Sequence, residues 1–492
     1  MLKEYRFEEI ELADDIEECL ENAKLELSRK QMLLKEKKLP VVVLFEGWGA
    51  SGIGTTLGKV IQNMDPRFYT VETMNKISED ETRKPFLYRH FIRIPENGMA
   101  TFYDHGWMND IVKQYIYQDI SRKEYVARVQ SVNNFERTLV DNGYLVIKFF
   151  FHISKEEQAK RMKRLLKHKN TKWRISDDDI WQNKHYDEYL NLYNDYMNQT
   201  NPAYAPWYVI DATNKKLAQL QVLETLMSCI QNRLDHEKKD ALIIDNIYPL
   251  RETINLNECD LSLTIDEETY RKEIKKCRKK LRKLHNIIYR KKIPVIIAYE
   301  GWDAAGKGGN IKRVTSGLDP RGYTVYPIAA PDKSEINRHY LWRFYKRLPK
   351  DGHVAIYDRT WYGRVMVERL EGFCSENDWQ RAYNEMNEFE KELSDWGAVV
   401  IKFWVQIDKD TQLARFTERQ NTPEKQWKIT DEDWRNREKW DLYENAVTEM
   451  LQKTNTEFAP WFVLESNDKK YARIKAMKIV IDEIEKKIKD ID

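Results

Sequence analysis

The sequence lacks long hydrophobic runs and has almost no excess of charge of either sign. Its longest strongly apolar stretches, Pro40–Phe45 and Val399–Val405, have the length of strands, so we expect no membrane-spanning segment. Lys and Arg number 82 against 80 Asp and Glu, a formal net charge of +2. This balance excludes a histone-like protein or an acidic tail, and affinity for a polyanion would have to come from local clusters of charge.

Cysteine is scarce, and the start of the chain has neither an apolar core nor a small-residue cleavage site, so we expect no secretory signal. The five cysteines are Cys19, Cys229, Cys259, Cys277 and Cys374. An odd, scattered set without CxxC spacing is typical of reduced thiols, which predicts a cytoplasmic protein. Nine histidines without an HExxH pattern do not favour a transition-metal enzyme.

The chain contains one domain-sized repeat at an offset of 254 residues. Between Pro40–Tyr69 and Pro294–Tyr323, 13 of 30 aligned positions are identical. The register continues through Asp104 and Asp358, Trp107 and Trp361, and Trp173 and Trp427. A register of this length indicates two copies of one domain and not a short-period solenoid. We predict domains at 1–235 and 265–492, joined by a linker at 236–264.

Each copy opens with a charged helical stretch, Ile10–Glu36 or Asp266–Lys291, followed by alternating strands and helices. In the second copy the predicted strands are Pro294–Tyr299, Thr324–Ile328, Val354–Tyr357, Val399–Ile407 and Trp461–Leu464. The predicted helices there include Lys307–Ser316, Glu335–Leu348, Asn377–Trp396, Asp408–Gln420 and Asp431–Lys453. The strands are continuously apolar, as expected when helices cover both faces of a sheet. We therefore predict an α/β fold of two tandem domains, each a mostly parallel sheet with helices on both faces.

The segment Gly301–Gly308 has the GxxxxGK spacing between an apolar strand and a helix. Glycines let backbone N–H groups turn toward phosphate oxygens, the helix N-terminus adds positive charge, and Lys307 neutralises a phosphate. The predicted phosphate-binding positions of the loop are Gly301, Ala304, Ala305, Gly306 and Gly308. The alternative is a glycine-rich turn whose lysine faces solvent.

The hydroxyl residue that usually follows the lysine and binds magnesium is Gly308 here. Asp303, inside the loop, is a candidate for the missing oxygen ligand. Its negative charge would repel an anionic substrate without a cation, so we predict Mg²⁺ or Mn²⁺ as the cofactor. Alternatively, Asp303 caps the following helix.

Asp358 ends the next apolar strand, at the position where phosphate-loop enzymes hold magnesium. Arg359 and Arg364 follow within reach of the same edge, and arginines clamp phosphates bidentately. The alternative is an internal salt bridge between the aspartate and an arginine. Co-occurrence with the glycine loop upstream favours the functional role.

A third cationic segment spans residues 414–428. Its cations are Arg415, Arg419, Lys425 and Lys428. The first two are four residues apart and share a helix face, and a cationic flap of this kind would close over a phosphoryl group and exclude water. A solvated charged surface is the alternative. Trp427 and its register-mate Trp173 are predicted to anchor packing.

Together, the Gly301–Gly308 loop, the Asp358–Arg364 segment and the Arg/Lys lid resemble the polyphosphate kinase 2 family. The resemblance covers nearly all of the second copy, including Tyr340–Phe344 and Val367–Phe373, with Thr360 where the family often has Ser. It implies a P-loop kinase fold like that of thymidylate kinases and Mg²⁺-dependent phosphoryl transfer between inorganic polyphosphate and nucleotides. The tandem arrangement is similar to the subgroup that phosphorylates AMP to ADP.

By that resemblance, Asp303 and Asp358 hold magnesium and orient or deprotonate the acceptor phosphate. The implied catalytic set is Asp303, Lys307, Asp358, Arg359, Arg364 and Arg415, and the implied polyphosphate-binding residues beyond the loop are Arg419, Lys425 and Lys428. Polyphosphate carries about one negative charge per residue, so it needs several cations along a channel and not one point contact.

The first copy keeps the glycines but loses the charges. The replacements, from second copy to first, are Lys307 to Ile53, Asp303 to Gly49, Arg359 to His105, Arg364 to Asp110 and Arg419 to Leu165. Arg161 and Arg174 keep a charge opposite Arg415 and Lys428. We predict an inactive first copy with a structural or regulatory role, in which residual polyanion binding stays open.

The leading hypothesis is an enzyme that transfers phosphate from polyphosphate to AMP, or to another nucleoside monophosphate, in the second copy. The alternatives are ADP as acceptor, an ATP-dependent nucleotide kinase, and a silent module that binds nucleotide or polyphosphate. The expected partners are polyphosphate and a purine nucleotide, without nucleic acid or membrane. The sequence leaves a homo-oligomer open.

Overall fold

The computed structural model describes residues 1–7, 12–74, 76–236, 240–252 and 254–491. Of Lys425 and Lys428 it describes the backbone alone, so the predicted roles of these two side chains lie outside the described structure. Over the described ranges, none of the helices is both long enough and apolar enough to cross a membrane.

The first half of the chain folds into alternating strands and helices. Its strands are β1 Val41–Gly47, β2 Tyr69–Thr73, β3 Ala100–Asp104, β4 Leu145–His152 and β5 Trp207–Asp211. Its helices are α1 Ile16–Glu36, α2 Ile53–Val60, α3 Glu79–Thr82, α4 Tyr88–Phe91, α5 Trp107–Ile116, α6 Arg122–Asp141, α7 Lys155–Leu166, α8 Asp177–Lys184, α9 Tyr186–Gln199 and α10 Lys215–Asp235, with 3₁₀ turns η1 Pro66–Phe68 and η2 Lys172–Arg174.

The second half repeats this order. Its strands are β6 Val295–Gly301, β7 Tyr323–Pro327, β8 Val354–Asp358, β9 Val399–Gln406 and β10 Trp461–Glu465. Its helices are α11 Glu267–Arg290, α12 Lys307–Thr315, α13 Lys333–Ile336, α14 Trp342–Tyr345, α15 Val367–Leu370, α16 Glu376–Asp395, α17 Lys409–Asn421, α18 Asp431–Glu438, α19 Trp440–Thr454 and α20 Lys469–Ile491. The 3₁₀ turns are η3 Leu256–Glu258, η4 Pro320–Gly322, η5 Trp361–Val365 and η6 Pro423–Lys428.

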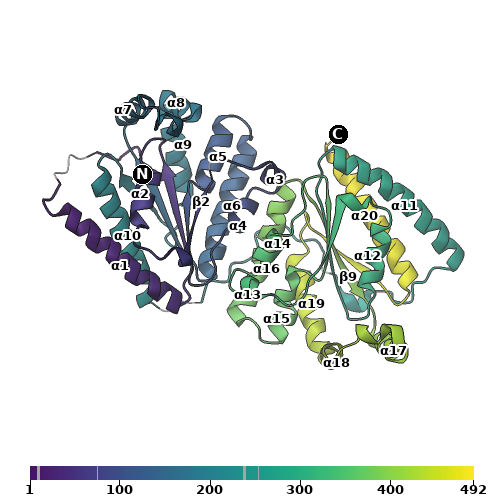
Figure 1. The fold of residues 1–492 in the computed structure, drawn as a ribbon. Helices are drawn as coiled ribbons and strands as arrows, with labels where there is room; N and C mark the ends of the chain where they lie inside the picture. The colour runs from purple at the N-terminus through teal and green to yellow at the C-terminus, as the bar shows by residue number, and fades with distance from the viewer. Residues whose placement is uncertain (8–11, 75, 237–239, 253, 492) are drawn as a thin grey trace. The chain divides into compact units, whose positions relative to one another are not determined.

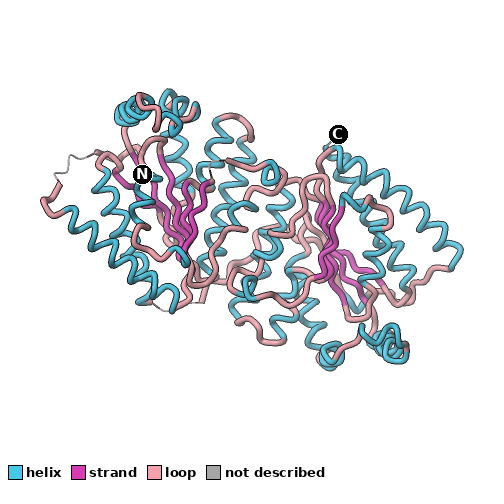
Figure 2. The backbone as a smooth tube through the Cα atoms, in the orientation of Figure 1, coloured by secondary structure: helices cyan, strands magenta, loops and turns pink. Residues whose placement is uncertain are grey.

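The strands form two five-stranded sheets, each with every pair parallel (Figure 2). The first sheet has the order β2-β3-β1-β4-β5 and the second the equivalent order β10-β9-β6-β8-β7. The central strands β1 and β6 each follow a long charged helix and end at a glycine loop. The carboxyl ends of parallel strands meet at one edge of a sheet, so the loops after β6 and β8 emerge side by side. The α/β fold predicted from the sequence is confirmed.

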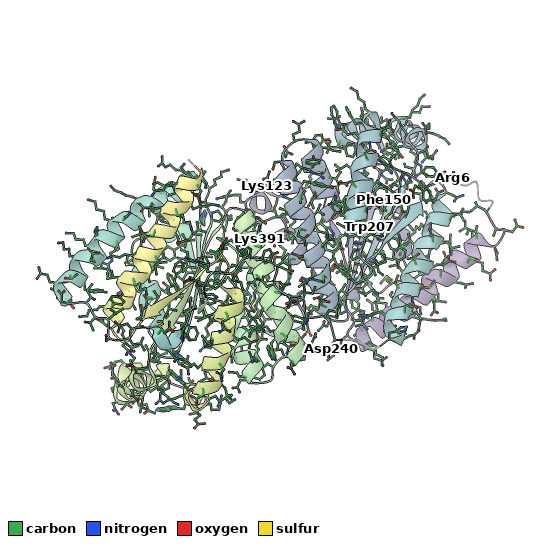
Figure 3. All side chains as sticks on the ribbon, turned by 180° about the vertical axis from the view of Figure 1, so that it is seen from behind. Arg6, Lys123, Phe150, Trp207, Asp240 and Lys391 are labelled. Atoms are coloured by element: carbon green, nitrogen blue, oxygen red, sulfur yellow. The ribbon has the colours of Figure 1, made fainter. Side chains whose placement is uncertain are left out.

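Helices cover both faces of each sheet, which is why the inner strands are mostly apolar. In the first sheet, α1 and α10 lie on one side and α5 and α6 on the other, and in the second α11, α12 and α20 lie opposite α16 and α19 (Figure 1). Phe150 and Trp207, on the neighbouring strands β4 and β5, lie in the first core (Figure 3).

The chain divides into two compact units that do not follow the repeat boundary completely. One unit comprises Met1–Ser78, Phe86–Asp240 and Lys333–Trp342, and the other comprises Glu79–Pro85, Ala241–Asp332 and Arg343–Asp492. The two short exchanged segments occupy equivalent positions of the repeat. Within the second unit, for example, Arg83 Nε donates to Asp351 Oδ1 at 2.6 Å. The boundaries 1–235, 236–264 and 265–492 stay a prediction.

Two helices predicted from the sequence are interrupted. The stretch predicted as Glu335–Leu348 forms the separate turns α13 and α14, and the boundary between the compact units falls within this stretch, between Trp342 and Arg343. Within the first unit, Arg338 Nη1 binds Glu96 Oε1 at 2.8 Å. The stretch predicted as Asp431–Lys453 divides at Lys439 into α18 and α19.

Candidate active site

The loop between β6 and α12 has a backbone that requires glycine at two positions. Gly301 has φ 151°, and a Cβ there would lie 2.6 Å from the carbonyl oxygen of Val405 on the neighbouring strand β9. Gly306, at the start of α12, has φ 111° in the left-handed region. These conformations let the chain reverse tightly between strand and helix, so that the first N–H groups of α12 face the loop.

Lys307 begins α12 and is half-buried. Its ammonium donates to the carbonyl of Gly301 at 2.6 Å, so the side chain folds back over the loop. The buried carboxylate of Glu300 lies close enough to this ammonium for the positive charge to act on the pKa of Glu300. Burial raises the pKa of Glu300, while a hydrogen bond from Thr360 and the charge of Lys307 oppose the rise.

Asp303 and Asp358 stand at the ends of neighbouring strands. Asp358 closes β8 opposite Tyr299 of β6, and Asp303 lies two residues beyond the end of β6. Asp303 Oδ2 accepts from Asn436 Nδ2 of α18 at 3.0 Å, and Asp303 Oδ1 lies 3.7 Å from Arg359 Nη2. Asn436 was not predicted from the sequence, because one amide carries no motif.

Arg359 follows Asp358 in the left-handed conformation, with φ 67°, and its N–H donates to the carbonyl of Tyr299. This constrained backbone turns the guanidinium toward the glycine loop. Burial lowers the pKa of Arg359, but the negative charges of Asp303 and Glu300 outweigh burial and raise it. Arg359 therefore keeps its positive charge at the loop.

The two aspartates fit a magnesium ion. Among the described residues no cluster of three or more His, Cys, Asp or Glu side chains is arranged to hold a metal. Mg²⁺ typically binds through one or two carboxylates and completes its shell with water and substrate phosphates. Asp303 and Asp358 supply hard oxygen ligands of this kind at one sheet edge, which suit Mg²⁺ or Mn²⁺, whereas a softer metal such as copper favours nitrogen or sulfur donors.

Arg415 binds the backbone carbonyls of the glycine loop. Its guanidinium is buried and donates to the carbonyls of Ala304 at 3.0 Å, Ala305 at 3.1 Å, Ser466 at 2.6 Å and Asn467 at 3.0 Å. Burial, together with the charge of the nearby Arg419, lowers the pKa of Arg415 to about 10. This geometry makes Arg415 a positioning residue for the loop, and its predicted catalytic role stays a prediction.

Two further cations lie against the loop without having been predicted from the sequence. Lys469 Cγ would be 3.8 Å from a Cβ on Gly306, and Arg473 Nη2 would be 3.0 Å from one on Gly309. Burial lowers the pKa of Lys469, and so do Arg415, Arg473 and Arg419. Both residues start α20, far along the sequence, and their i, i+4 spacing alone does not distinguish them from other surface cations.

Arg364 contacts a residue of its own segment. Arg364 Nη1 binds Glu368 Oε2 at 2.6 Å, an ion pair with a glutamate four residues later and not the aspartate–arginine bridge considered as an alternative. Trp427 and Trp173 do not anchor packing as predicted, because both side chains are 76% exposed. Each indole N–H instead donates to a backbone carbonyl three residues earlier, which suffices to hold it on the surface.

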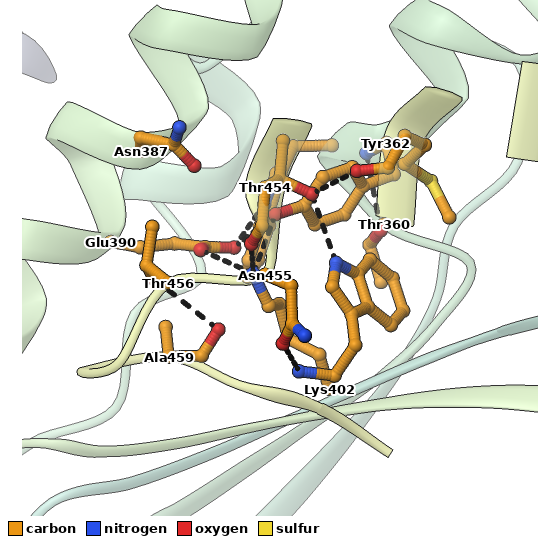
Figure 4. A network of polar contacts seen from close by, with 12 residues as sticks. Thr360, Tyr362, Asn387, Glu390, Lys402, Thr454, Asn455, Thr456 and Ala459 are labelled. Atoms are coloured by element: carbon orange, nitrogen blue, oxygen red, sulfur yellow. Dashed lines mark hydrogen bonds and ion pairs between the residues drawn. The ribbon is translucent and has the colours of Figure 1, made fainter. Parts of the chain in front are cut away.

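A buried polar network supports the segment after Asp358 (Figure 4). Lys402 Nζ donates to Glu390 Oε2 at 2.7 Å, to the Tyr362 hydroxyl at 2.9 Å and to the Thr454 carbonyl at 2.7 Å. Glu390 also accepts from Trp361 Nε1 at 3.0 Å. These hydrogen bonds join Lys402, Glu390, Tyr362 and Trp361 and fix η5 to β9 and α16.

The first copy fills the equivalent loop with its own side chains. A Cβ on Gly49 would lie 2.1 Å from Asp179 Oδ1, so Asp179 occupies the space in which an aspartate side chain would stand. Gly49 N donates to Gln182 Oε1 at 2.8 Å, and Ile53 is buried at the start of α2. Asp110 is buried and faces Arg89 at 3.3 Å.

A glycine loop at the carboxyl edge of a parallel sheet, with acidic and basic residues around it, defines the class of phosphoryl-transfer α/β enzymes. The model of the family "Polyphosphate kinase 2" matches residues 11–239 and 264–491. The chain belongs to the polyphosphate kinase 2 family.

Named relatives match both halves of the chain. The chain is 37% identical over 489 residues to a polyphosphate:AMP phosphotransferase of Pseudomonas aeruginosa, covering 97% of this chain and 98% of that protein. It is 36% identical over 450 residues to a polyphosphate:AMP phosphotransferase of Acinetobacter johnsonii, covering 90% of each. The crystal structure of a polyphosphate kinase 2 from Pseudomonas aeruginosa superposes with a TM-score of 0.87 at 35% identity, covering 100% of both chains.

Proposed function

We propose that the second half of the chain transfers a phosphoryl group from inorganic polyphosphate to AMP and releases ADP. The observation that carries the proposal is the glycine loop with Lys307 beside the two strand-end carboxylates, Asp303 and Asp358. The tandem relatives, which match almost end to end, are named for AMP as acceptor. A relative named ADP-polyphosphate phosphotransferase covers 49% of this chain, so it matches one copy and not the tandem.

In this proposal each group has one role. Lys307, Arg359, Lys469 and the N–H groups at the start of α12 bind phosphate oxygens and neutralise charge that spreads over the transferred group. Asp303 and Asp358 would hold Mg²⁺, which when bound neutralises phosphate charge as a Lewis acid. Asn436 orients Asp303 through Oδ2, and the other carboxylate oxygen, Oδ1, faces Arg359. Arg364 and the lid residues Arg419, Lys425 and Lys428 remain proposed contacts of polyphosphate.

The test supplies AMP with either polyphosphate or ATP as the sole donor, with and without Mg²⁺, and follows ADP. We expect ADP from polyphosphate with Mg²⁺ or Mn²⁺, and no ADP after chelation. Formation of ADP from ATP alone would instead assign an ATP-dependent nucleotide kinase. Replacing AMP by ADP and following ATP separates the second acceptor, and binding without any turnover would indicate a silent module.

The setting of this reaction is also a proposal. We infer a cytoplasmic enzyme whose partners are polyphosphate and a purine nucleotide. All five cysteines are free thiols, as expected in a reducing compartment.

A further inference from the structure

One face of α11 gathers cations that the active site does not use. We define the α11 face as Lys275, Lys279, Arg282, Lys283, Asn286 and Arg290, which the 3.6-residue period places on one side of the helix. All six residues are exposed. The last five, together with Ile287, line a shallow open groove. Within the described part of the chain, none of the five cations has an acidic partner in a salt bridge.

The α11 face is not required to fold the helix. The opposite side buries Ile274, Leu281 and Ile288 and packs on α20, so the apolar half of α11 already has its partner. Like charges three and four residues apart, as at Lys275, Lys279 and Lys283, repel one another and destabilise a helix. An anion bound along the α11 face would relieve this repulsion, and the relief would favour its binding.

The first copy provides an internal control. The equivalent helix α1 packs on α10 in the same way, yet the positions that match the α11 face are Glu21, Leu25, Ser28, Arg29, Met32 and Glu36. One arginine and two glutamates replace five cations. The basic face therefore accompanies the copy that keeps the catalytic loop, and it is absent from the copy that has lost it.

Helix α11 begins beside the support of the catalytic loop, and the α11 face follows from Lys275 onward. The N–H of Ile265, just before α11, donates to Asp468 Oδ2 at 2.9 Å, and Lys470 Nζ lies 3.5 Å from Glu267 Oε2. The residues before Asp468, Ser466 and Asn467, are those that Arg415 ties to the glycine loop. From there α11 runs about 1.5 Å per residue away from the loop.

We propose that the α11 face is a second binding site for inorganic polyphosphate, which holds the part of a long chain that extends beyond the catalytic loop. This rests on the proposed function, because the donor is the polyanion concerned. A membrane surface fits less well, since the apolar side of α11 is buried in the unit. Single-stranded nucleic acid also fits less well, because Tyr289 is the one exposed aromatic side chain of α11, whose residues are all described, and it offers no row of stacking platforms.

The test uses the full chain and a variant with Lys279→Gln, Arg282→Gln and Lys283→Gln. Glutamine has a helix propensity close to that of Lys and Arg, so α11 should persist. The matched control removes three exposed cations from the first copy, Arg29→Gln, Lys37→Gln and Lys59→Gln. Calorimetry without nucleotide measures the affinity for long-chain polyphosphate and for tripolyphosphate at several NaCl concentrations.

We expect the α11 variant to bind long-chain polyphosphate about tenfold more weakly, and the slope of log affinity against log salt to fall by about two, at ~0.7 per contact. Tripolyphosphate affinity and the control variant should be unchanged. In turnover, KM for long chains should rise about tenfold, while kcat and KM for AMP stay constant.

The proposal is overturned if the control loses as much affinity, if tripolyphosphate binding falls equally, or if single-stranded poly(A) and not polyphosphate responds to the α11 substitutions. Failure of the proposed function would show separately, as ATP and not polyphosphate serving as donor. The binding measurement contains no nucleotide, so it decides on the α11 face in either case.

Discussion

The two glycine loops have nearly the same backbone and opposite electrostatics. Gly47 and Gly301 have φ 147° and 151°, and Gly52 and Gly306 have φ 103° and 111°. In both copies a Cβ on the first glycine would collide with the adjacent strand. The glycines are thus kept by close packing and by the tight reversal of the chain, and their presence alone does not indicate phosphate chemistry.

The supports of the loops are also shared. Arg161 donates to the carbonyls of Ser51 at 2.8 Å and Ala212 at 2.7 Å, as Arg415 does to the matching carbonyls of its own copy. What differs is the set of side chains that face the loop: a hydrophobic Ile53 and a buried Asp110 have replaced two cations. The scaffold and the chemistry of this fold are therefore separable, and a copy can lose the second while it keeps the first.

Substitution of the strand-end aspartates should give the largest difference in turnover between the two copies. We expect Asp358→Asn to lower turnover about a thousandfold, because the loss of one charge on the metal and phosphate site costs that order of stabilisation. The matched change Asp104→Asn in the first copy should leave turnover within about twofold, since that loop lacks the lysine. Steady-state ADP formation measures both, and equal losses would mean that both copies work.

The buried ion pairs should affect stability in both copies but activity in one. Lys402→Met leaves Glu390 without its cation, and Lys148→Met does the same to Glu136. We expect each change to lower the free energy of unfolding by about 3 kcal/mol, measured calorimetrically. Lys402→Met should also lower kcat, because Glu390 holds Trp361 beside the Asp358 segment.

A loss of kcat from Lys148→Met in protein that is still folded would contradict this division. A Lys402→Met variant that is destabilised and fully active would show that the network is structural alone.

The smallest expected difference between the two copies is in the pH dependence of their stability. Trp48 Nε1 donates to His152 Nδ1 at 2.9 Å, whereas Trp302 donates to Gln406 Oε1, which does not titrate. Burial lowers the pKa of His152 from its ordinary 6.5 to about 4. The unfolded chain then binds the proton more readily, so the stability of the first unit is complete above about pH 6.5 and falls between pH 6.5 and 4.

At pH 5 this loss is about 2 kcal/mol relative to pH 7. Thermal unfolding of the wild-type chain and of His152→Gln at both pH values measures it. The substitution copies the second half and should remove this part of the pH dependence. An unchanged pH dependence in His152→Gln would assign the loss to other groups.

Much of the fold could be predicted from the sequence, because continuous apolar strands and the long internal register are local or pairwise signals. The two helices were mispredicted where tertiary packing overrides local pattern: the stretch that contains α13 and α14 passes from one compact unit to the other between Trp342 and Arg343. The exposure of Trp427 was missed for a related reason, since a large aromatic residue next to a charged helix does not reveal which way it points.

The candidate site was predictable where the chemistry has a motif. Lys307 and Asp358 follow strands in recognisable strings, whereas Lys469 and Asn436 reach the loop from α20 and α18, far away in sequence. The contacts of Arg415 with the loop could not be predicted, because the sequence pattern of a cation on a helix does not show whether it faces the substrate or the backbone carbonyls of the loop.

The claim that the chemistry resides in the second half is tested most directly by exchanging the two loop residues, Lys307→Ile and Ile53→Lys, singly in the full chain. We expect Lys307→Ile to lose turnover about a thousandfold while it stays folded, and Ile53→Lys to leave it unchanged. Substantial ADP formation by Lys307→Ile would contradict the account and assign catalysis to the first copy.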